Sequence, residues 1–290
     1  MPAYASINDQ KARLPDGRYL GYAEYGDLVG KPVMVFPGAP SSRILPLRKD
    51  QAAELGVRLI VVERPGFGLS DFKKGRRLLD WPKDVASFAD ELGLEEFAVV
   101  GISAGGPYAA VCASKLPQRI KRVAIIGGVG PMDHEEFADE MPRIRKAGIK
   151  IARKVPWMLT VLLSLFFNPQ LNPEAFYERI LSGNSALDQA KLRNPEMKSV
   201  LIRNYQEATR EGMQGFANEA VILSDHWGFD LKDIQIPVDV WHGEKDENVS
   251  LSAARHLVQN IPDCTAHFLP EQGHWLHLEY WREILTALIE

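Results

Sequence analysis

A serine stands among glycines where a short apolar run gives way to a helical pattern. The run at 97–100 (FAVV) is typical of a buried strand, and the segment G-I-S-A-G at 101–105 follows it directly. A serine lifted clear of a sheet on such a tight strand-to-helix turn needs small neighbours, because larger side chains would clash there. The N–H groups and positive dipole end of the following helix would face Ser103. The segment therefore predicts a nucleophilic serine.

A serine hydroxyl is a poor nucleophile without a base, and the chain has seven histidines. His274 lies beside a glycine, just past the end of the last predicted strand, where a loop at the carboxyl edge of the sheet would carry the base. His267 falls within that strand and His277 in the closing helical pattern, so we interpret both as structural. His242 ends an earlier strand, and we expect it to make local hydrogen bonds. His274 is the predicted base.

An acid must orient the base and stabilise the imidazolium that forms. Along the chain the acid should follow the serine and precede the histidine. Three acidic residues crowd the loop after the run at 238–241 (VDVW), namely Glu244, Asp246 and Glu247. Asp133, after the preceding predicted strand, is an alternative, because some hydrolases carry the acid there.

The negative oxygen that develops when serine attacks a carbonyl needs two preorganised donors. The backbone N–H of Ala104, directly after the nucleophile, is the first candidate. The second should come from the loop after the run at 33–36 (VMVF), and we select the N–H of Ala39 because the next residue is a proline. Ser41 or Ser42 in this loop would at the same time cap a helix.

The elements that must hold these residues alternate between strand and helix patterns in the first half of the chain. Apolar runs, typical of strands that helices cover on both faces, fall at 33–36, 57–62, 97–100 and 122–126. Helical patterns lie between them at 42–55, 81–92 and 104–116. A turn pattern at 15–17 (PDG) before the run at 18–25 predicts a hairpin with the preceding segment. The alternation predicts a mostly parallel sheet.

The alternation stops after Gly127. Residues 131–230 show helical patterns interrupted by prolines and no convincing strand. Alternation resumes with strand patterns at 238–241 and 265–269 and helical patterns at 250–259 and 276–289. We therefore predict an α/β core at 1–130 and 231–290 and an inserted helical cap at 131–230. Ligands bind outside the carboxyl ends of parallel strands, so such a cap would roof the site.

Composition limits the functional classes. Apolar residues make up 46% of the chain, charged residues 25%, and the net charge is -4, so we expect no nucleic-acid partner. Cys112 and Cys264 have neither metal-ligand nor disulfide spacing, which favours buried free thiols in a cytoplasmic protein. The first ten residues do not resemble a signal peptide. We predict no metal and no cofactor, and the sequence does not indicate an oligomeric state.

The longest apolar run, at 155–167, is too short to span a bilayer, which needs about 20 residues. Arg153 and Lys154 precede this run, so contact with a membrane surface is an alternative. We favour a cap helix that packs over the pocket, and we expect no membrane partner.

Taken together, these residues resemble the α/β-hydrolase superfamily, in the branch with a serine nucleophile and a helical cap, over nearly the whole chain. Besides G-I-S-A-G, the segment at 63–71 (ERPGFGLSD) is similar to the D-x-P-G-x-G-x-S loop of that family. The segment at 236–246 is similar to its P-V-x-x-x-x-G-x-x-D acid loop, and 273–275 (GHW) to its G-H-x base motif. The resemblance implies a mostly parallel eight-stranded sheet with helices on both faces and the triad Ser103, Asp246 and His274.

Two positions depart from the family pattern. The oxyanion loop usually reads His-Gly, and here it reads Pro37-Gly38. The donor is a backbone group, so catalysis would survive, but a supporting hydrogen bond would be missing. Glu63 stands where aspartate is usual, and we expect it to pair locally with Arg64.

The cap residues bear on the substrate. A serine nucleophile argues against haloalkane dehalogenases and epoxide hydrolases, which use a carboxylate. Aromatic and aliphatic side chains in the predicted cap suggest an apolar roof, and no cluster of cap acids marks a site for a free amino terminus. They are Trp157, Leu162, Phe166, Phe167, Phe176, Tyr177, Tyr205, Phe216, Trp227 and Phe229. As substrate contacts we select Trp157, Phe166 and Trp227, together with Trp275 beside the base.

We therefore predict a serine hydrolase that cleaves a carboxylic ester or lactone through an acyl-enzyme, with a moderately large, mostly apolar small-molecule substrate. A macrolide-type lactone is one candidate substrate. A proline iminopeptidase-like enzyme and a C–C bond hydrolase are alternatives. A non-catalytic ligand-binding relative is a further alternative, against which an intact triad argues.

Overall fold

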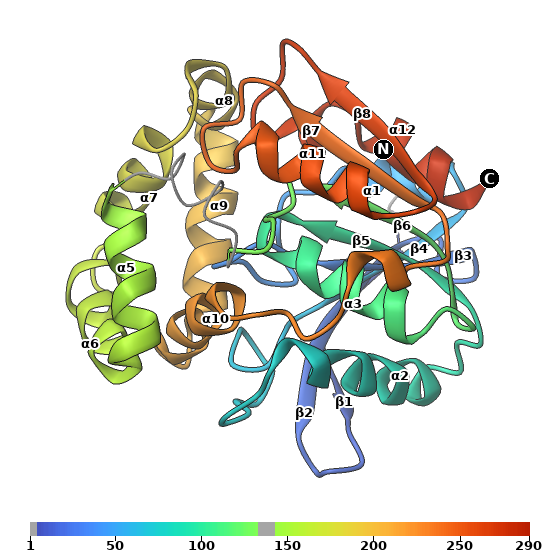
Figure 1. Cartoon of the computed structure of the whole chain (residues 1–290), viewed down its shortest axis with the longest axis horizontal. Coiled ribbons are helices and arrows are strands. Elements are labelled where there is room, and N and C mark those ends of the chain that lie inside the picture. The colour runs from blue at the N-terminus through green and yellow to red at the C-terminus, as the bar shows by residue number, and fades with distance from the viewer. Residues whose placement is uncertain (1–4, 133–142) are drawn as a thin grey trace.

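The structure, a computed structural model, describes residues 5–132 and 143–290 and is built around one sheet (Figure 1). The described part of the chain gives this sheet eight strands in the order β1-β2-β4-β3-β5-β6-β7-β8. β1 and β2 form the predicted hairpin, β2 is also antiparallel to β4, and every later pair is parallel. The predicted mostly parallel sheet is thus confirmed. The strands are β1 (Ala5–Arg13), β2 (Tyr19–Gly26), β3 (Lys31–Phe36), β4 (Val57–Val62), β5 (Phe97–Ile102), β6 (Ile120–Ile126), β7 (Val238–Gly243) and β8 (Cys264–Leu269).

Helices cover both faces of the sheet, which explains why its central strands are apolar without alternation. One face packs against α2 (Trp81–Glu91), α3 (Gly106–Lys115) and α11 (Leu251–Asn260). The other face packs against α1 (Lys49–Glu54) and α12 (Trp281–Ile289). Every residue of β5 is buried between these layers, so the strand that leads to the serine is held rigidly.

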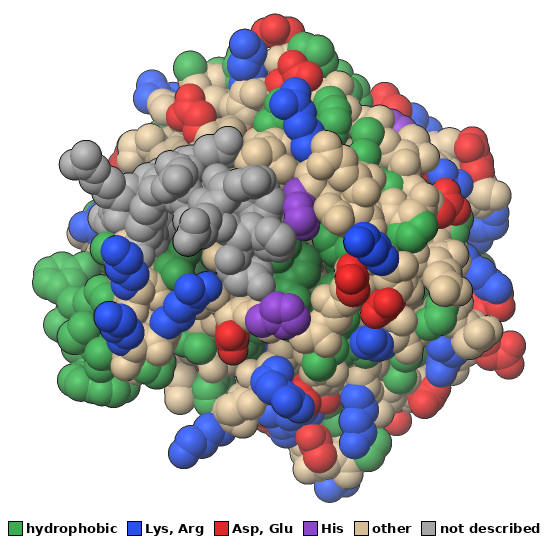
Figure 2. Space-filling view, viewed as in Figure 1, with side chains coloured by type: hydrophobic (Ala, Val, Ile, Leu, Met, Phe, Trp, Pro, Cys, Tyr) green, Lys and Arg blue, Asp and Glu red, His purple; other side chains and the backbone are tan. Residues whose placement is uncertain are grey.

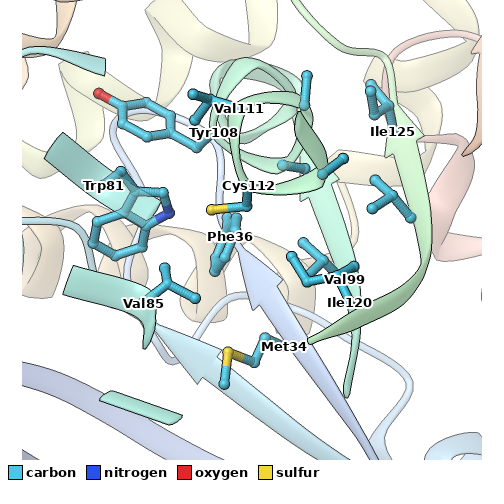
Figure 3. Packing of buried hydrophobic residues seen from close by; sticks show 14 of the residues in the cluster. Met34, Phe36, Trp81, Val85, Val99, Tyr108, Val111, Cys112, Ile120 and Ile125 are labelled. Atoms are coloured by element: carbon cyan, nitrogen blue, oxygen red, sulfur yellow. The ribbon is translucent and has the colours of Figure 1, made fainter. Parts of the chain in front are cut away.

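An aromatic cluster fixes the first of these layers close to the carboxyl ends of β3 and β5 (Figure 3). The ring of Trp81 meets the rings of Phe36 and Tyr108 edge to face, with centroids 5.3 Å and 5.9 Å away. Each such pair contributes about 0.5–1.5 kcal/mol beyond its buried area. Cys112, on the same helix as Tyr108, is fully buried, as predicted. The cluster fixes the end of β3, from which the predicted oxyanion loop continues, and the start of α3, which follows the predicted nucleophile.

The segment predicted as a helix at 42–55 is helical only over Lys49–Glu54. The N–H and hydroxyl of Ser42 both donate to Asn204 Oδ1, at 2.9 Å and 2.8 Å, and the N–H of Arg43 donates to Glu63. These bonds hold 42–48 as a loop, so neither Ser41 nor Ser42 caps the helix. The closing helix is also shorter than predicted, because a separate 3-10 turn at Leu276–Leu278 precedes α12.

The chain between β6 and β7 forms helices and no strand within its described residues. These helices gather beside the sheet, at the left of Figure 1. They are α5 (Arg143–Lys154), α6 (Pro156–Phe166), α7 (Pro173–Ser182), α8 (Ala186–Leu192), α9 (Pro195–Ala208) and α10 (Gln214–Ser224).

Prolines in this region begin helices. Pro173 and Pro195 each occupy the first position of a helix, where the missing N–H costs nothing. Asn172, just before α7, accepts a hydrogen bond of 3.0 Å from the N–H of Ala175, and Asn194 caps α9 in the same way. Removal of such a cap costs about 1 kcal/mol.

Candidate active site

Ser103 stands on the tight turn between β5 and α3. Its φ of 53° lies in the left-handed region, which a serine adopts only at a cost of about 1–3 kcal/mol that the surrounding packing must offset. The turn leaves no room for side chains on its flanks. A Cβ on Gly101 would lie 2.6 Å from the carbonyl oxygen of Gly105 and 2.7 Å from Ala109. The glycines that the sequence places around Ser103 are therefore required by close backbone approach.

His274 and Asp246 are joined by a hydrogen bond. Nδ1 of His274 lies 2.7 Å from Oδ2 of Asp246, whose side chain is fully buried. The other carboxylate oxygen of Asp246 accepts the N–H groups of Asn248 at 2.7 Å and Val249 at 2.9 Å. Burial alone would raise the pKa of the Asp246 carboxyl, but His274, His242 and the N–H of Val249 outweigh it and lower the pKa. Asp246 is therefore ionised and orients the imidazole.

A glycine at the end of β6 makes room for this pair. Gly127 has a φ of +52°, and a Cβ there would lie 3.1 Å from Nδ1 of His274 and 3.4 Å from Oδ2 of Asp246. Its N–H donates to the carbonyl oxygen of Trp241 in β7. Because Gly127 has no side chain, the imidazole and the carboxylate can lie directly against its backbone.

One cavity of about 470 Å³ brings together most of the residues singled out by the sequence. Ser103 and His274 both line it, and so do Ala39 and Ala104, whose N–H groups are the predicted oxyanion donors. Gly38 lies so close to the nucleophile that a Cβ there would contact the Cβ of Ser103 at 3.4 Å. Asp133, the alternative acid, lies outside the described residues.

Arg64 supports the loop that carries Ala39. It donates one hydrogen bond to the carbonyl oxygen of Pro37 and another, of 3.0 Å, to that of Gly38. Its Nε also donates to Glu219 of α10 at 2.7 Å. The loop that lacks the usual histidine is therefore held by a guanidinium from the loop after β4. The sequence could not reveal this, because the partners are 26, 27 and 155 residues away.

The expected pairing of Glu63 with Arg64 was wrong. Glu63 is buried and pairs with Arg43 at 2.9 Å, while its second oxygen accepts the N–H of Leu69 at 2.7 Å. Adjacent residues at the end of a strand point in opposite directions, so Glu63 and Arg64 reach different partners.

Glu219 forms the centre of a buried ionic network beneath the cavity. Its carboxylate accepts from Arg64, from Arg76 at 2.6 Å and from the hydroxyl of Tyr108 at 2.7 Å. Burial disfavours the charge on Arg76, but Tyr108 and Glu219 outweigh this and raise the pKa of Arg76. Arg76 therefore stays charged, and the bonds of Arg64 tie helix α10 to the oxyanion loop.

A second buried carboxylate, Asp188 of α8, holds the backbone of the predicted base. Its oxygens accept the N–H of His274 at 2.7 Å and that of Trp275 at 3.2 Å. A side chain on Gly273 would collide with this carboxylate. Sequence reasoning missed Asp188, since its S-x-x-D context at 185–188 indicates only a helix start.

Asn184 joins the loops of the predicted base and acid. Its side-chain oxygen accepts from the indole N–H of Trp275 at 3.0 Å and from the side chain of Asn248 at 2.6 Å. Asn248 in turn donates its backbone N–H to Asp246. The segment between α7 and α8 thus contacts both loops on which the His274–Asp246 pair depends.

The cavity walls are mainly apolar, but not all of the selected contacts reach them. Trp275 lines the cavity as predicted. Trp157 and Phe166 are 68% and 57% exposed on the outer face of α6, and Trp227 packs into the main core against Phe229. These three predictions were wrong. A helical position alone does not tell which face of α6 turns inward, and Trp227 lies in the loop after α10. The aromatic lining comes from Phe167, Phe176, Tyr205, Phe216 and Trp275.

The remaining histidines near the site are structural in different ways. His277 is buried at the cavity wall, and burial, assisted by His274 and Lys191, lowers its pKa to about 3. Burial also lowers the pKa of His242. The Asp246 carboxylate, 4.0 Å from Nε2 of His242, and the backbone of Val249 act in the opposite direction. His267 pairs with Asp239 at 2.9 Å inside the sheet.

Comparison with known proteins places this geometry in context. The model of a family described as alpha/beta hydrolase fold matches residues 31–280. A 2-hydroxy-6-oxononadienedioate/2-hydroxy-6-oxononatrienedioate hydrolase from Burkholderia vietnamiensis is 26% identical over 261 residues, which cover 88% of this chain and 83% of that protein.

Solved structures share the same arrangement of elements. An esterase from Exiguobacterium antarcticum superposes with a TM-score of 0.75 at 18% identity, over 98% of each chain. The enol-lactonase from Burkholderia xenovorans LB400 superposes with a TM-score of 0.72 at 17% identity, over 97% of this chain and 98% of that one. At such identities these structures bear on the fold alone.

Proposed function

The chain belongs to the alpha/beta hydrolase fold family, and from that premise we propose that it is a serine hydrolase with Ser103, His274 and Asp246 as its catalytic triad. One observation carries the proposal. Ser103 and His274 line the same cavity, while a buried, ionised carboxylate holds the imidazole from behind at 2.7 Å. This is the set of roles that acyl transfer by serine requires.

The mechanism proceeds in two steps. His274 takes the hydroxyl proton as Ser103 attacks the carbonyl carbon, and the N–H groups of Ala39 and Ala104 stabilise the oxyanion. His274 then gives its proton to the leaving oxygen, and an acyl-enzyme forms. A water molecule, activated by His274, attacks the acyl carbon, which releases the acid and returns the proton to Ser103.

The substrate that fits best is an ester or lactone with a mostly apolar acyl group. Among the described lining residues the single carboxylate is Glu219, and none is Lys or Arg. Both oxygens of Glu219 are engaged by Arg64 and Arg76. Burial of a substrate charge without a partner is costly. A cavity of about 470 Å³ is in the range used for drug-sized ligands and favours a compact group over a macrocyclic lactone.

C–C bond hydrolysis is the second candidate, because the relative from Burkholderia vietnamiensis is named for it. Its named dienedioate carries two carboxylates, and the described cavity offers them no cation. A proline iminopeptidase-like activity would need a free acid for the substrate ammonium, and Glu219 is already paired. Ester and lactone hydrolysis therefore stands first.

We also propose that residues 131–230 form a cap over a core made of 1–130 and 231–290. Leu159 and Leu163 of α6 and Phe176 of α7 line the same cavity as Ser103. Helices from this segment therefore supply the wall opposite the sheet, where they would select the substrate.

The test is a panel of p-nitrophenyl esters and simple lactones, assayed with the unaltered protein and with Ser103→Ala. The variant should lose activity by a factor on the order of 10⁶. A fluorophosphonate should label the unaltered protein and leave Ser103→Ala unlabelled. Ser114→Ala, on helix α3 directly after the turn that carries Ser103 but outside the cavity lining, is the matched control and should remain active. Equal ester cleavage by Ser103→Ala would refute the assignment, and an unlabelled, inactive native protein would favour a ligand-binding role.

A further inference from the structure

Helix α6 presents an apolar stripe to the outside of the molecule. Trp157, Val161 and Leu165 are spaced four residues apart on one side of the helix, and they are 68%, 46% and 65% exposed. Phe166 adds a second exposed ring beside Leu165. The opposite side of the helix is used differently, since Leu159 and Leu163 line the cavity. The outer stripe thus has no role in the core or in the site.

Within the described residues, the segment that carries this stripe is rich in basic residues. The five acids that precede it in the sequence, Asp133, Glu135, Glu136, Asp139 and Glu140, lie outside the described residues. Residues 143–173 contain no Asp or Glu, although the whole chain has a net charge of -4. The segment carries Arg143, Arg145, Lys146, Lys150, Arg153 and Lys154. Lys150 and Lys154 are exposed on α5, which packs against α6. Figure 2 shows basic side chains next to an apolar patch at the left of the molecule.

Although the sequence favoured no membrane partner, we propose that the outer stripe of α6 and the exposed lysines of α5 form a docking surface for an anionic phospholipid membrane. Tryptophan and phenylalanine side chains insert favourably at the boundary between headgroups and acyl chains. Lysines beside them are attracted by the negative potential of anionic lipid, which extends over about a Debye length. No helix within residues 5–132 or 143–290 is long and apolar enough to cross a membrane, so the contact is peripheral.

Charge distinguishes this occupant from a second copy of the chain. A twofold contact would place the same helices of two copies against each other. Lys150 and Lys154 would then face their own counterparts across the interface, and the described helices α5 and α6 contain no acid to compensate. A negatively charged lipid surface would take up the apolar stripe between its headgroups and attract Lys150 and Lys154 beside it.

Co-sedimentation of the full-length protein with vesicles tests the proposal. Vesicles of phosphatidylcholine mixed with phosphatidylglycerol should pellet the protein, and vesicles of phosphatidylcholine alone should pellet far less. The double variant Trp157→Ser, Phe166→Ser should weaken binding at least about tenfold, as should Lys150→Glu, Lys154→Glu. Raised salt should weaken binding by the unaltered protein.

Val29→Ser is the matched control, because Val29 is 95% exposed and lies outside the segment at 143–173. It should bind as the unaltered protein does, and circular dichroism should show every variant folded. Three results would overturn the proposal: no pelleting with anionic vesicles, equal pelleting with both vesicle types, or no effect of the serine variants. Sedimentation velocity that shows a dimer, dissociated by Trp157→Ser, Phe166→Ser without any vesicle binding, would assign the stripe to a second copy. None of these readouts depends on catalysis.

Discussion

The guanidinium of Arg64 donates a hydrogen bond of 3.0 Å to the carbonyl oxygen of Gly38. A second nitrogen of the same group donates to the carbonyl oxygen of Pro37, so Arg64 binds the loop at two adjacent peptide units. Planar guanidinium groups suit such paired acceptors, whereas an ammonium offers a single point of charge. We infer that these two hydrogen bonds set the direction of the Ala39 N–H and replace the support that a histidine usually gives.

Arg64→Lys should therefore impair the reaction more than substrate binding. Lysine keeps the charge beside Glu219 but cannot reach both carbonyl oxygens while it pairs with that carboxylate. Loss of one correctly placed oxyanion donor lowers kcat by roughly 100- to 1,000-fold, which is the upper limit expected here. Steady-state kinetics with a p-nitrophenyl ester should show a lower kcat with little change in KM.

Arg58→Lys provides the matched control for this change. Arg58 lies in β4, close to Arg64 in the chain, and pairs with Glu24 at 2.5 Å away from the cavity. Its replacement should leave kcat nearly unchanged. If Arg64→Lys kept full kcat while circular dichroism showed it folded, Arg64 would have no part in positioning the oxyanion loop.

Asp246→Asn should lower kcat far more than a change of a neighbouring acid in the same loop. The amide is nearly the same size, but it favours the wrong tautomer of His274 and cannot stabilise the imidazolium. A loss of about 10⁴-fold in kcat is expected for such a change. Glu247→Gln, an exposed position in the same loop, should retain activity. If the two variants were equally active, a residue other than Asp246 would have to orient His274.

Asp188→Ala should loosen the loop that carries the predicted base. Two backbone N–H groups would lose their acceptor, and each buried unsatisfied group costs about 1–3 kcal/mol. We expect a lower thermal midpoint and a lower kcat, with Asp188→Asn partly restoring both. The pH profile of kcat should also shift, because the backbone of His274 bonds directly to this carboxylate. Asp233→Ala, at an exposed site, is the control. An unchanged pH profile and kcat in Asp188→Ala would limit this residue to structural support.

The sequence predicted the sheet because its strands are short apolar runs, which can be recognised without knowledge of distant residues. β5 is a continuous apolar run, β4 is apolar except for Arg58, and the glycines around Ser103 have a steric reason to be there. His274 was predicted in the same way, from its place after β8. For the acid, strand order led only to the loop after β7, and Asp246 was chosen among three acids there by the resemblance to the family's acid loop.

Side-chain contacts between distant segments were beyond sequence reasoning. Asp188 and His274 are 86 residues apart, and Arg64 and Glu219 are 155 apart. Nothing in the spacing of these residues tells which way each side chain turns. The same limit explains why Trp157 was taken as a substrate contact. Only Thr160 and Ser164 are polar in 156–166, so the sequence offers no charged or broad polar face from which to identify the outer side of α6.

His277 should make the protein less stable in mild acid. Burial lowers its pKa to about 3, whereas an unfolded histidine titrates near pH 6.5. Between these values the unfolded state binds the proton and the folded state does not, so stability falls as pH falls. The slope from this residue approaches about 1.4 kcal/mol per pH unit. Urea unfolding from pH 7 to pH 5 should show that slope reduced in His277→Gln, while His226→Gln, at an exposed site, matches the unaltered protein. An identical slope in His277→Gln would mean that His277 gains a proton in the folded protein as readily as in the unfolded chain.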